Sequence, residues 1–290
     1  MGWRSAAAGM LLVLSGCQGA REPQDRFADP RFNTSQDEVR VCPGPSTVPG
    51  IDVSYYQGTI DWNQVAGAPA GYKFAITRIN DGSFMDPQFG RNWGEIQRVG
   101  LIRGAYQFWE PNDDPTYQAN IVINAVGQLG AGDLPVTLDV EWTTGTPTAT
   151  DIQTWVNLVT QGTGKTPIIY TAVGYWNQYF TTEFGNLPLW VANYNVTCPT
   201  VPSSWSDWVF WQPNGALVPG ISGNVDQDVF NGTLADLQAF AGAVNTNGCS
   251  GSQVTACGNF GCACADAQCN GGFCPGTGCN TTSTNNCAAF

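Results

Sequence analysis

Two acidic residues stand at the end of an apolar run, Leu134-Pro-Val-Thr-Leu-Asp139-Val-Glu141. If this run is a β-strand, its side chains alternate between two faces, so Asp139 and Glu141 share one face with Thr137. Same-face neighbours lie roughly 6.5–7 Å apart along a strand. At that distance mutual repulsion and partial burial are expected to raise the pKa of at least one of the two carboxyl groups. A carboxyl group with a raised pKa can act as a general acid near neutral pH.

Two further acids stand in the first and last predicted strands. Asp52 lies in Pro49-Gly-Ile-Asp52-Val-Ser54, and Asp226 lies near the start of Val225–Gly232. Because closure of a barrel brings its first and last strands together, Asp52 and Asp226 are expected to join Asp139 and Glu141 at the strand ends where barrel enzymes hold their catalytic groups. The alternative is a set of solvated surface acids, but the run that leads into Asp139 is apolar.

The composition restricts the chemistry further. The chain has no histidine, which excludes Ser-His-Asp and Cys-His catalysis and histidine-ligated zinc in their usual forms. The 11 basic and 23 acidic residues give a net charge of −12. A chain this acidic has no electrostatic footprint for nucleic acid or for an anionic membrane surface. No motif indicates a metal or another cofactor, so none is expected.

Eight short apolar runs are predicted to be strands. They are Gly50–Ser54, Lys73–Ile79, Ile102–Trp109, Leu134–Glu141, Pro167–Thr171, Leu189–Tyr194, Asp207–Gln212 and Val225–Phe230. Helices are expected from a cap at Asp86 to Val99, at Pro115–Leu129, at Thr150–Thr160 and at Thr233–Ala243. The second helix is expected to bury Tyr117, Ile121, Ala125 and Leu129, and the third Ile152, Val156 and Val159.

This alternation of strands and helices predicts an α/β fold, a parallel barrel over residues 49–241 with a reduced set of helices. An open doubly wound sheet is the alternative. It has less support, because no Gly-rich nucleotide-binding fingerprint or P-loop follows the first strand.

The N-terminus has the pattern of an export signal. Arg4 precedes an apolar stretch, Ala6–Leu14, that is too short to span a bilayer. Leu14-Ser15-Gly16-Cys17 resembles a bacterial lipobox, which makes residues 1–16 a lipoprotein signal peptide and Cys17 the lipidated residue. An ordinary cleaved signal is the alternative. We expect an exported protein that is lipid-anchored to the bacterial cell envelope, or secreted, with residues 17–48 as a flexible tether.

The remaining ten cysteines are even in number, which favours disulfides in an exported chain. Cys42 and Cys198 are the only two before the tail and are expected to pair with each other. Residues 242–290 are expected to form a small disulfide-rich module with a thirty-residue repeat, because Cys249 and Cys279, Cys257 and Cys287, and Phe260 and Phe290 are each thirty residues apart. The second copy is incomplete, and the module is expected to bind the cell wall or a protein partner.

Several stretches of the middle region, in order along the chain, carry a family resemblance. They are Gly50-Ile-Asp-Val-Ser-Tyr-Tyr-Gln57, Phe74-Ala-Ile-Thr-Arg78, Gly100-Leu-Ile-Arg-Gly-Ala-Tyr-Gln-Phe108, Pro135-Val-Thr-Leu-Asp-Val-Glu141, Trp190-Val-Ala-Asn-Tyr194, Phe210-Trp-Gln212 and Val225–Gly232. Together they resemble glycoside hydrolase family 25, the N,O-diacetylmuramidase lysozymes, over nearly all of residues 49–241. The resemblance implies a flattened TIM-like barrel of eight strands and hydrolysis of the β-1,4 bond between N-acetylmuramic acid and N-acetylglucosamine in peptidoglycan.

The resemblance also implies residue roles. Glu141 resembles the general acid, and Asp139 resembles the neighbour that tunes it and orients the substrate's acetamido group. Asp52 and Asp226 resemble the flanking acids that stabilise positive charge at the anomeric carbon or handle water. The chain departs from the family pattern at two places. Tyr55-Tyr56 stand where the family often has His-Trp, and Gln107 stands where it often has histidine. A non-catalytic peptidoglycan-binding protein is the alternative function.

Aromatic residues near the predicted strand ends are candidates for a sugar-binding platform, because sugars pack apolar faces on aromatic rings. The candidates are Tyr106, Phe108, Tyr170, Trp190, Tyr194 and Trp211. For each ring, a place in the hydrophobic core is the alternative.

Overall fold

The computed structural model describes residues 39–242. The predicted signal peptide, the lipidation site Cys17, most of the tether and the cysteine-rich repeat lie outside the described residues. Within residues 39–242, no helix is both long enough and apolar enough to cross a membrane.

Each of the eight predicted runs contains or overlaps one strand of the barrel, although the ends of the strands are shifted. The strands are β2 (Thr47–Val53), β3 (Phe74–Asp81), β5 (Ile102–Phe108), β6 (Thr137–Asp139), β7 (Ile168–Ala172), β8 (Leu189–Ala192), β10 (Phe210–Leu217) and β11 (Asn224–Asn231). Short strands β1 (Val39–Arg40), β4 (Phe84–Met85) and β9 (Thr200–Val201) accompany them. The helices are α1 (Trp62–Ala66), α2 (Phe89–Arg98), α3 (Pro115–Val126), α4 (Ala149–Thr163), α5 (Val173–Tyr179) and α6 (Leu234–Phe240), with a 3₁₀ turn at Tyr55–Gln57.

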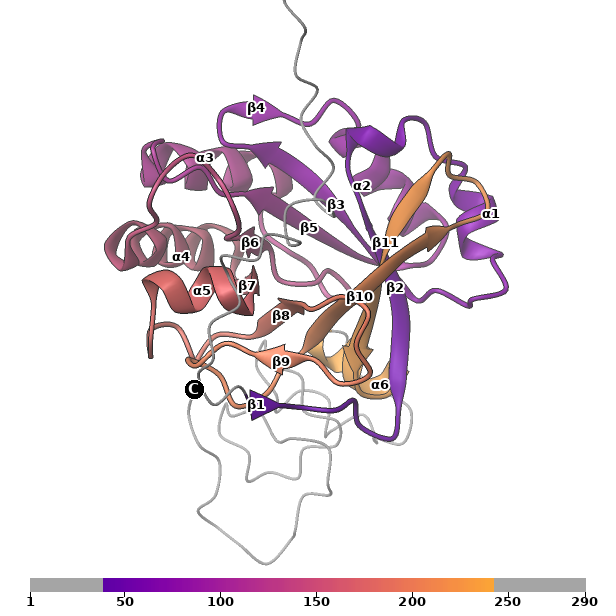
Figure 1. The fold of residues 1–290 in the computed structure, drawn as a ribbon. Coiled ribbons are helices and arrows are strands. Elements are labelled where there is room, and N and C mark those ends of the chain that lie inside the picture. Colours follow the sequence, from indigo (N-terminus) through magenta and orange to yellow (C-terminus); the bar gives the residue numbers. More distant parts are fainter. Residues whose placement is uncertain (1–38, 243–290) are drawn as a thin grey trace, which may run out of the picture. The chain divides into compact units, whose positions relative to one another are not determined.

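The main sheet closes on itself. Its order is β2-β11-β10-β8-β7-β6-β5-β3, and β2 also pairs with β3, while β4 extends the edge of β3. The result is an eight-stranded barrel with a reduced set of helices, as predicted. Figure 1 shows α3, α4 and α5 together on one side of the barrel, next to β5, β6 and β7.

The expectation of an all-parallel barrel is wrong at one strand. β11 runs antiparallel to both β10 and β2, whereas the other neighbours in the barrel pair in parallel. The reason is the length of the connection: Leu217 pairs with Asn224 across a short turn. A parallel return needs a crossover of about a dozen residues or more. The reversal places the start of β11, and not its end, beside the carboxyl end of β2.

Two apolar layers hold the barrel. Outside it, Val136, Leu138 and Val140 are fully buried against α4, whose Ile152, Trp155, Val156 and Val159 belong to the same cluster, as predicted for three of these four. Inside it, the rings of Phe74 and Phe210 lie 5.2 Å apart, and Phe230 lies 5.2 Å from Phe210. Gly50 is required here, because a Cβ at this position would lie 2.4 Å from the Phe74 ring.

Two local helix predictions are wrong. Asp86 does not cap α2, since Gln88 precedes the helix and the Asp86 carboxylate accepts from Gln88 N at 2.9 Å and from Tyr55 N at 2.9 Å. In α3 the buried face is Gln118, Ala119 and Val122, while Tyr117 is 53% exposed. Gln118 turns inward because its side chain bonds both the N–H and the carbonyl of Glu110.

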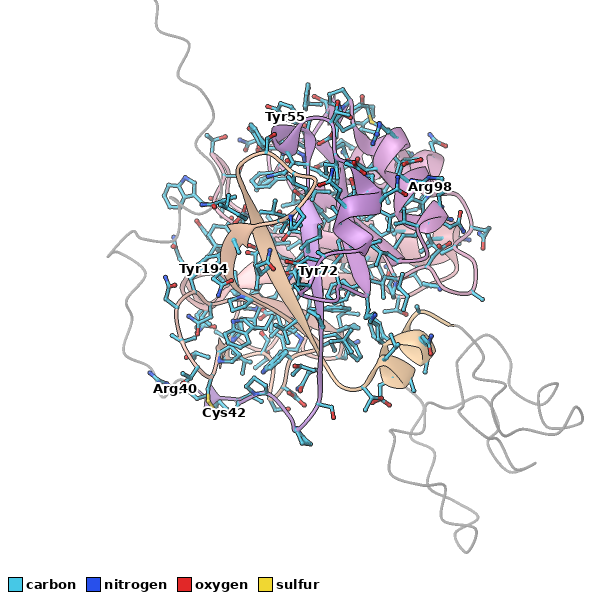
Figure 2. The ribbon with its side chains drawn as sticks, turned by 90° about the vertical axis from the view of Figure 1, so that its right-hand side faces the viewer. Arg40, Cys42, Tyr55, Tyr72, Arg98 and Tyr194 are labelled. Atoms are coloured by element: carbon cyan, nitrogen blue, oxygen red, sulfur yellow. A yellow bond between two sulfur atoms is a disulfide. The ribbon has the colours of Figure 1, made fainter. Side chains whose placement is uncertain are left out.

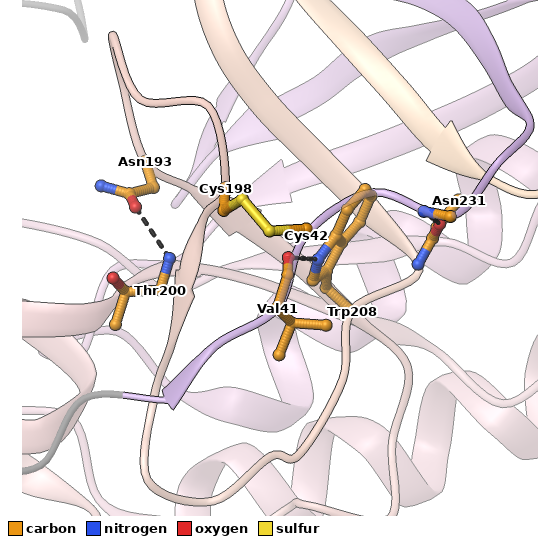
Figure 3. Close-up of a disulfide and its surroundings, with 8 residues drawn as sticks. Val41, Cys42, Asn193, Cys198, Thr200, Trp208 and Asn231 are labelled. Atoms are coloured by element: carbon orange, nitrogen blue, oxygen red, sulfur yellow. Dashed lines mark hydrogen bonds between the residues drawn. A yellow bond between two sulfur atoms is a disulfide. The ribbon is translucent and has the colours of Figure 1, made fainter.

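Residues before the barrel are held more closely than a flexible tether would be. Cys42 and Cys198 form the expected disulfide, with Cα atoms 4.2 Å apart. Val39 and Arg40 pair with Val201 and Thr200, and Trp208 Nε1 donates to Val41 O at 2.8 Å (Figure 3). The tether predicted up to residue 48 therefore ends earlier, because residues 39–42 are attached to the segment between β8 and β10, and Gly44, Thr47 and Val48 are bonded to β11.

The disulfide closes a loop of 156 residues. Closing so long a loop removes conformational entropy from the unfolded chain, so the double variant Cys42→Ser/Cys198→Ser is expected to lose about 2–5 kcal/mol of unfolding free energy. Urea unfolding followed by tryptophan fluorescence measures the loss. Wild-type protein treated with a reductant is the control and should match the double variant. Equal stability of the double variant and the oxidised wild type would contradict the structural role of the bond.

Candidate active site

The antiparallel pairing of β2 and β11 sets two of the predicted acids opposite each other. Asp52 and Asp226 are Cα partners in the register, so their side chains lie on the same face of the sheet. Asp52 is 8% exposed, and Asp226 is half-buried. The predicted meeting of acids from the first and last strands therefore occurs, at the carboxyl end of β2.

Asp139 and Glu141 come to the same rim from the opposite wall. β6 ends at Asp139, so Glu141 stands just beyond the strand and not within it as predicted, although Val140 N still donates to Tyr170 O at 2.9 Å. Asp139 is 6% exposed and Glu141 2% exposed. The negative charge of Glu141 acts on Asp52, and those of Glu141, Asp226 and Asp52 all act on Tyr194. The charges of Asp139 and Glu141 both act on Tyr170. The four predicted acids thus form one electrostatic group.

A hydrogen-bonded chain of polar side chains supports Asp52. Gln212, on β10, donates from Nε2 to Asp52 Oδ2 at 2.6 Å. Its Oε1 accepts from the Tyr170 hydroxyl at 2.8 Å and from the Tyr194 hydroxyl. Because both hydroxyls donate to Oε1, the amide of Gln212 can present only its N–H₂ group to Asp52. The two tyrosines therefore orient the donor that holds the Asp52 carboxylate.

Burial dominates the proton affinities at this rim. Burial raises the pKa of Asp52 well above its ordinary value, and the nearby charge of Asp226 raises it further. Asp228, also on β11, has a pKa raised by burial and then by the charges of Asp52 and Asp226. Burial likewise raises the phenol pKa of Tyr106, Tyr170 and Tyr194, so these phenols keep their protons and remain hydrogen-bond donors.

A buried arginine organises the neighbouring part of the rim. Arg78, on β3, is 5% exposed and forms an ion pair from Nε to Asp86 Oδ2 at 3.1 Å. Its guanidinium lies 5.1 Å from the centroid of the Tyr55 ring and 5.4 Å from that of Tyr56. Asp86 also accepts from Tyr55 N, so this ion pair fixes the turn that follows β2. Figure 2 shows Tyr55 at the opposite end of the folded part from Cys42, which separates this rim from the disulfide.

The six predicted aromatics do not all reach the acids. Register places Phe108, Asp139, Tyr170 and Trp190 side by side on the inner face, and Tyr106 lies on the same face, two positions before Phe108. Tyr194 follows β8 and is half-buried. Trp190 is only 2% exposed and donates from Nε1 to Asp228 Oδ1 at 3.0 Å, so it lies below the rim.

Trp211 is not part of the group. It projects from the other face of β10, where it pairs with Val191, packs 5.9 Å from the Trp208 ring and donates from Nε1 to Asn193 O at 2.8 Å. Gln107 is also on an outer face, where its Oε1 accepts from Trp155 Nε1 at 2.5 Å. Gln107 therefore lies beneath helix α4 and not beside the acids.

Several residues of the site were not predicted. Asp228, Gln212 and Arg78 lie on inner faces, and strand alternation could have identified them, since Asp228 is two residues after Asp226 and Gln212 two after Phe210. Two exposed aromatics also stand at the rim: Phe84, 50% exposed and opposite Asp81, and Trp142, 38% exposed and next to Glu141. Within residues 39–242, no group of three or more His, Cys, Asp or Glu side chains is arranged to hold a metal ion.

This arrangement of an enclosed carboxyl group facing other acids can deliver a proton to a bound oxygen and stabilise positive charge beside it. Comparison with known proteins agrees with that chemistry. Residues 51–218 match the profile of glycosyl hydrolases family 25.

Three relatives illustrate the similarity. Lysozyme M1 of Streptomyces globisporus is 35% identical over 223 residues, which are 71% of this chain and 75% of that protein. The uncharacterized protein YegX of Escherichia coli K12 is 36% identical over 215 residues, which are 71% of this chain and 77% of the length of YegX. The crystal structure of a bacterial lysozyme from Streptomyces coelicolor is 34% identical and superposes with a TM-score of 0.62, covering 68% of this chain and 98% of that one.

Replacement of Gln212 by leucine tests the hydrogen-bonded chain. The variant leaves Asp52 Oδ2 without its amide donor and the Tyr170 and Tyr194 hydroxyls without their shared acceptor. The free energy of unfolding is expected to fall by about 1–3 kcal/mol, measured by thermal or urea unfolding. Gln153→Leu, on the exposed face of α4, is the matched control and should change stability by less than about 0.5 kcal/mol. Equal effects of the two variants would show that the buried chain is not stabilising.

Proposed function

Because this chain belongs to glycosyl hydrolases family 25, we propose that it is a muramidase that hydrolyses the β-1,4 bond between N-acetylmuramic acid and N-acetylglucosamine in peptidoglycan. The observation that carries the proposal is the convergence of Asp52, Asp226 and Glu141 on one rim. Asp52 and Asp226 are register partners, and Gln212 links Asp52 by hydrogen bonds to Tyr170, whose strand partner Asp139 lies two residues before Glu141. A glycosidase needs one carboxyl group that gives a proton and at least one that remains charged.

Glu141 is the proposed general acid. It is enclosed, at 2% exposure, and burial favours the neutral form of a carboxyl group. It gives its proton to the glycosidic oxygen as the bond from that oxygen to the anomeric carbon breaks. Asp139, the inner-face neighbour before it, orients the acetamido group of the substrate and tunes Glu141.

Asp52 and Asp226 stabilise the positive charge that develops at the anomeric carbon, or orient the water that attacks it. The Gln212 amide fixes the direction of the Asp52 carboxylate before substrate arrives. A group that is already oriented needs no reorganisation during the reaction, which is where most electrostatic catalysis originates.

Aromatic rings at the rim provide the proposed sugar contacts. Tyr55, Phe84 and Trp142 follow or flank the carboxyl ends of β2, β3 and β6 and are more exposed than the inner rings. Tyr55 and Phe84 pack edge to face with centroids 5.6 Å apart. Such surfaces suit the apolar faces of sugar rings. Among the predicted candidates, Tyr106, Phe108 and Tyr194 are proposed to add to this platform, while Trp190 and Trp211 donate hydrogen bonds to Asp228 and Asn193.

Replacement of the general acid tests the proposed reaction. Glu141→Gln keeps the shape of the side chain but cannot give up a proton, so the release of reducing ends from purified peptidoglycan should fall by about 10²-fold or more. The matched control is Glu183→Gln, in the exposed turn where Glu183 accepts from Thr181 N and Thr182 N. It should retain activity, and circular dichroism should show both variants folded.

The outcomes of this experiment separate the two functions. A fully active Glu141→Gln variant would contradict the assignment of the acid. Wild-type protein that sediments with peptidoglycan but releases no reducing ends would instead support a non-catalytic wall-binding protein.

We also propose that the protein works outside the cytoplasm, attached through Cys17. The Cys42–Cys198 disulfide supports an oxidising compartment. When the full chain is expressed in a bacterium that processes lipoproteins, wild type should appear in the membrane fraction and Cys17→Ser in the soluble fraction, as detected by immunoblot. Membrane retention of Cys17→Ser equal to that of wild type would exclude this anchor.

A further inference from the structure

Asp228 has no role in the reaction proposed above, yet it is one of the most enclosed acids of the barrel. It lies on β11, two residues after Asp226, opposite Gly50 of β2, and is 1% exposed. Asp52 is the next inward residue of β2 after Gly50, so Asp228 and Asp52 are diagonal neighbours on the inner face of the β2–β11 pair. An ionised carboxylate at such a position is costly unless its charge is matched.

The two carboxyl oxygens of Asp228 have different contacts. Oδ1 accepts a hydrogen bond from Trp190 Nε1 at 3.0 Å. Oδ2 is buried and receives no hydrogen bond from an N–H or hydroxyl donor of the described residues. The side chains of Asp228 and Asp52 are nevertheless within hydrogen-bonding contact of each other. Two carboxyl groups can share a hydrogen bond only if one of them carries a proton.

The contacts of Asp52 indicate which group carries it. Asp52 Oδ2 accepts from Gln212 Nε2 at 2.6 Å, and the two tyrosine hydroxyls on Gln212 Oε1 prevent the amide from turning over. Asp52 is therefore supplied with a donor on β10 and can accept a second one from Asp228. Asp228 Oδ2 lacks an external donor, as expected of an oxygen that holds its own hydrogen.

We propose that Asp228 is a positioning residue that remains protonated and donates a hydrogen bond to Asp52, so that the buried pair carries one negative charge, located on Asp52. In its bearing on catalysis, this inference rests on the proposed muramidase function. The shared proton and the Gln212 amide then hold Asp52 from two sides. A single fixed charge remains facing the rim, where three other acids would make a second buried charge unfavourable.

The surrounding charges agree with this assignment. Asp226 from β11 and Glu141 from the segment after β6 face Asp52, and so do the phenols Tyr106 on β5 and Tyr194 after β8. None of these groups is a cation. Arg78, on the adjacent strand β3, is ion-paired with Asp86 and Asp81. Burial and the charges of Asp52 and Asp226 accordingly raise the pKa of Asp228 well above its ordinary range.

The variant Asp228→Asn reproduces the proposed protonated state. Its Oδ1 can accept from Trp190 Nε1, and its Nδ2 can donate to Asp52. Peptidoglycan hydrolysis by this variant at pH 6 should remain within about threefold of wild type in kcat/KM, whereas Asp52→Asn should lose about 10²-fold. Asp228→Leu, which removes the donor, should lower kcat more than Asp228→Asn does. A loss in Asp228→Asn as large as that in Asp52→Asn would overturn the proposal, because it would mean that Asp228 acts as a charged carboxylate.

Two measurements that need no activity separate this inference from the proposed function. The infrared spectrum of folded wild type at pH 7 should contain a carbonyl stretch of a protonated buried carboxyl group that is lost in Asp228→Asn, in addition to any such band from Glu141, which both proteins retain and which Glu141→Gln identifies. A wild type without the Asp228 band would overturn the proposal even if it is an active muramidase. A wild type that shows the band but cannot hydrolyse peptidoglycan would uphold the proton-sharing pair and contradict the proposed function.

The pH dependence of stability gives the second readout. Because the pKa of Asp228 is higher in the folded than in the unfolded chain, its proton stabilises the fold below the unfolded pKa, and this contribution is lost as pH rises through the folded pKa. Asp228→Asn cannot lose a proton there. The Tm of Asp228→Asn relative to wild type should therefore increase as pH rises above about 4, the ordinary pKa of an aspartate, and level off once the folded pKa of Asp228 is passed. A Tm difference that stays constant from about pH 4 upward would overturn the proposal.

Discussion

The pairing of β2 with both β3 and β11 closes the barrel and sets Asp52 directly opposite Asp226. Everything at the rim depends on this closure. Without it, Asp52 and Asp226, which are 174 residues apart in the sequence, would not be neighbours. The antiparallel direction of β11 matters as much as the pairing itself, because it turns the beginning of the last strand toward the end where the other strands finish.

Closure also creates the main energetic difficulty of the fold. Asp52, Asp139, Glu141 and Asp228 are all nearly enclosed, and like charges in an enclosed space repel. Hydrogen bonds to these carboxyl groups reduce that cost. Gln212 donates to Asp52, Trp190 donates to Asp228, and two tyrosine hydroxyls fix the orientation of Gln212. Phenols with raised pKa values remain donors beside these carboxyl groups. The same features that make the acids tolerable also fix their directions, which is what catalysis requires.

Much of this could be predicted from the sequence because period-two patterns and apolar runs are local signals. They were sufficient for the eight strands, for the buried stripe of α4 and for the shared face of Thr137 and Asp139. The direction of β11 could not be read from its residues, since it follows from the short turn before it. Trp211 was predicted to lie near the acids because its side chain is aromatic. It is adjacent to Gln212 in β10, however, so the two side chains lie on opposite faces of the strand. Asp228 was not predicted as a site residue, although its separation of two residues from Asp226 places it on the inner face. Tyr117 was expected inside because it shares an apolar stripe with Ile121, Ala125 and Leu129. The hydrogen bonds of Gln118 instead decide which face of α3 turns inward.

The central claim is that acids from distant strands surround one glycosidic bond. A crystal structure of the Glu141→Gln protein with a peptidoglycan tetrasaccharide tests it most directly. The account predicts that the side chain at position 141 lies about 3 Å from a glycosidic oxygen, with Asp52 and Asp226 beside the adjoining anomeric carbon. A glycan bound away from the carboxyl end of β2 and β6, or one whose glycosidic oxygens all lie beyond reach of position 141, would contradict it.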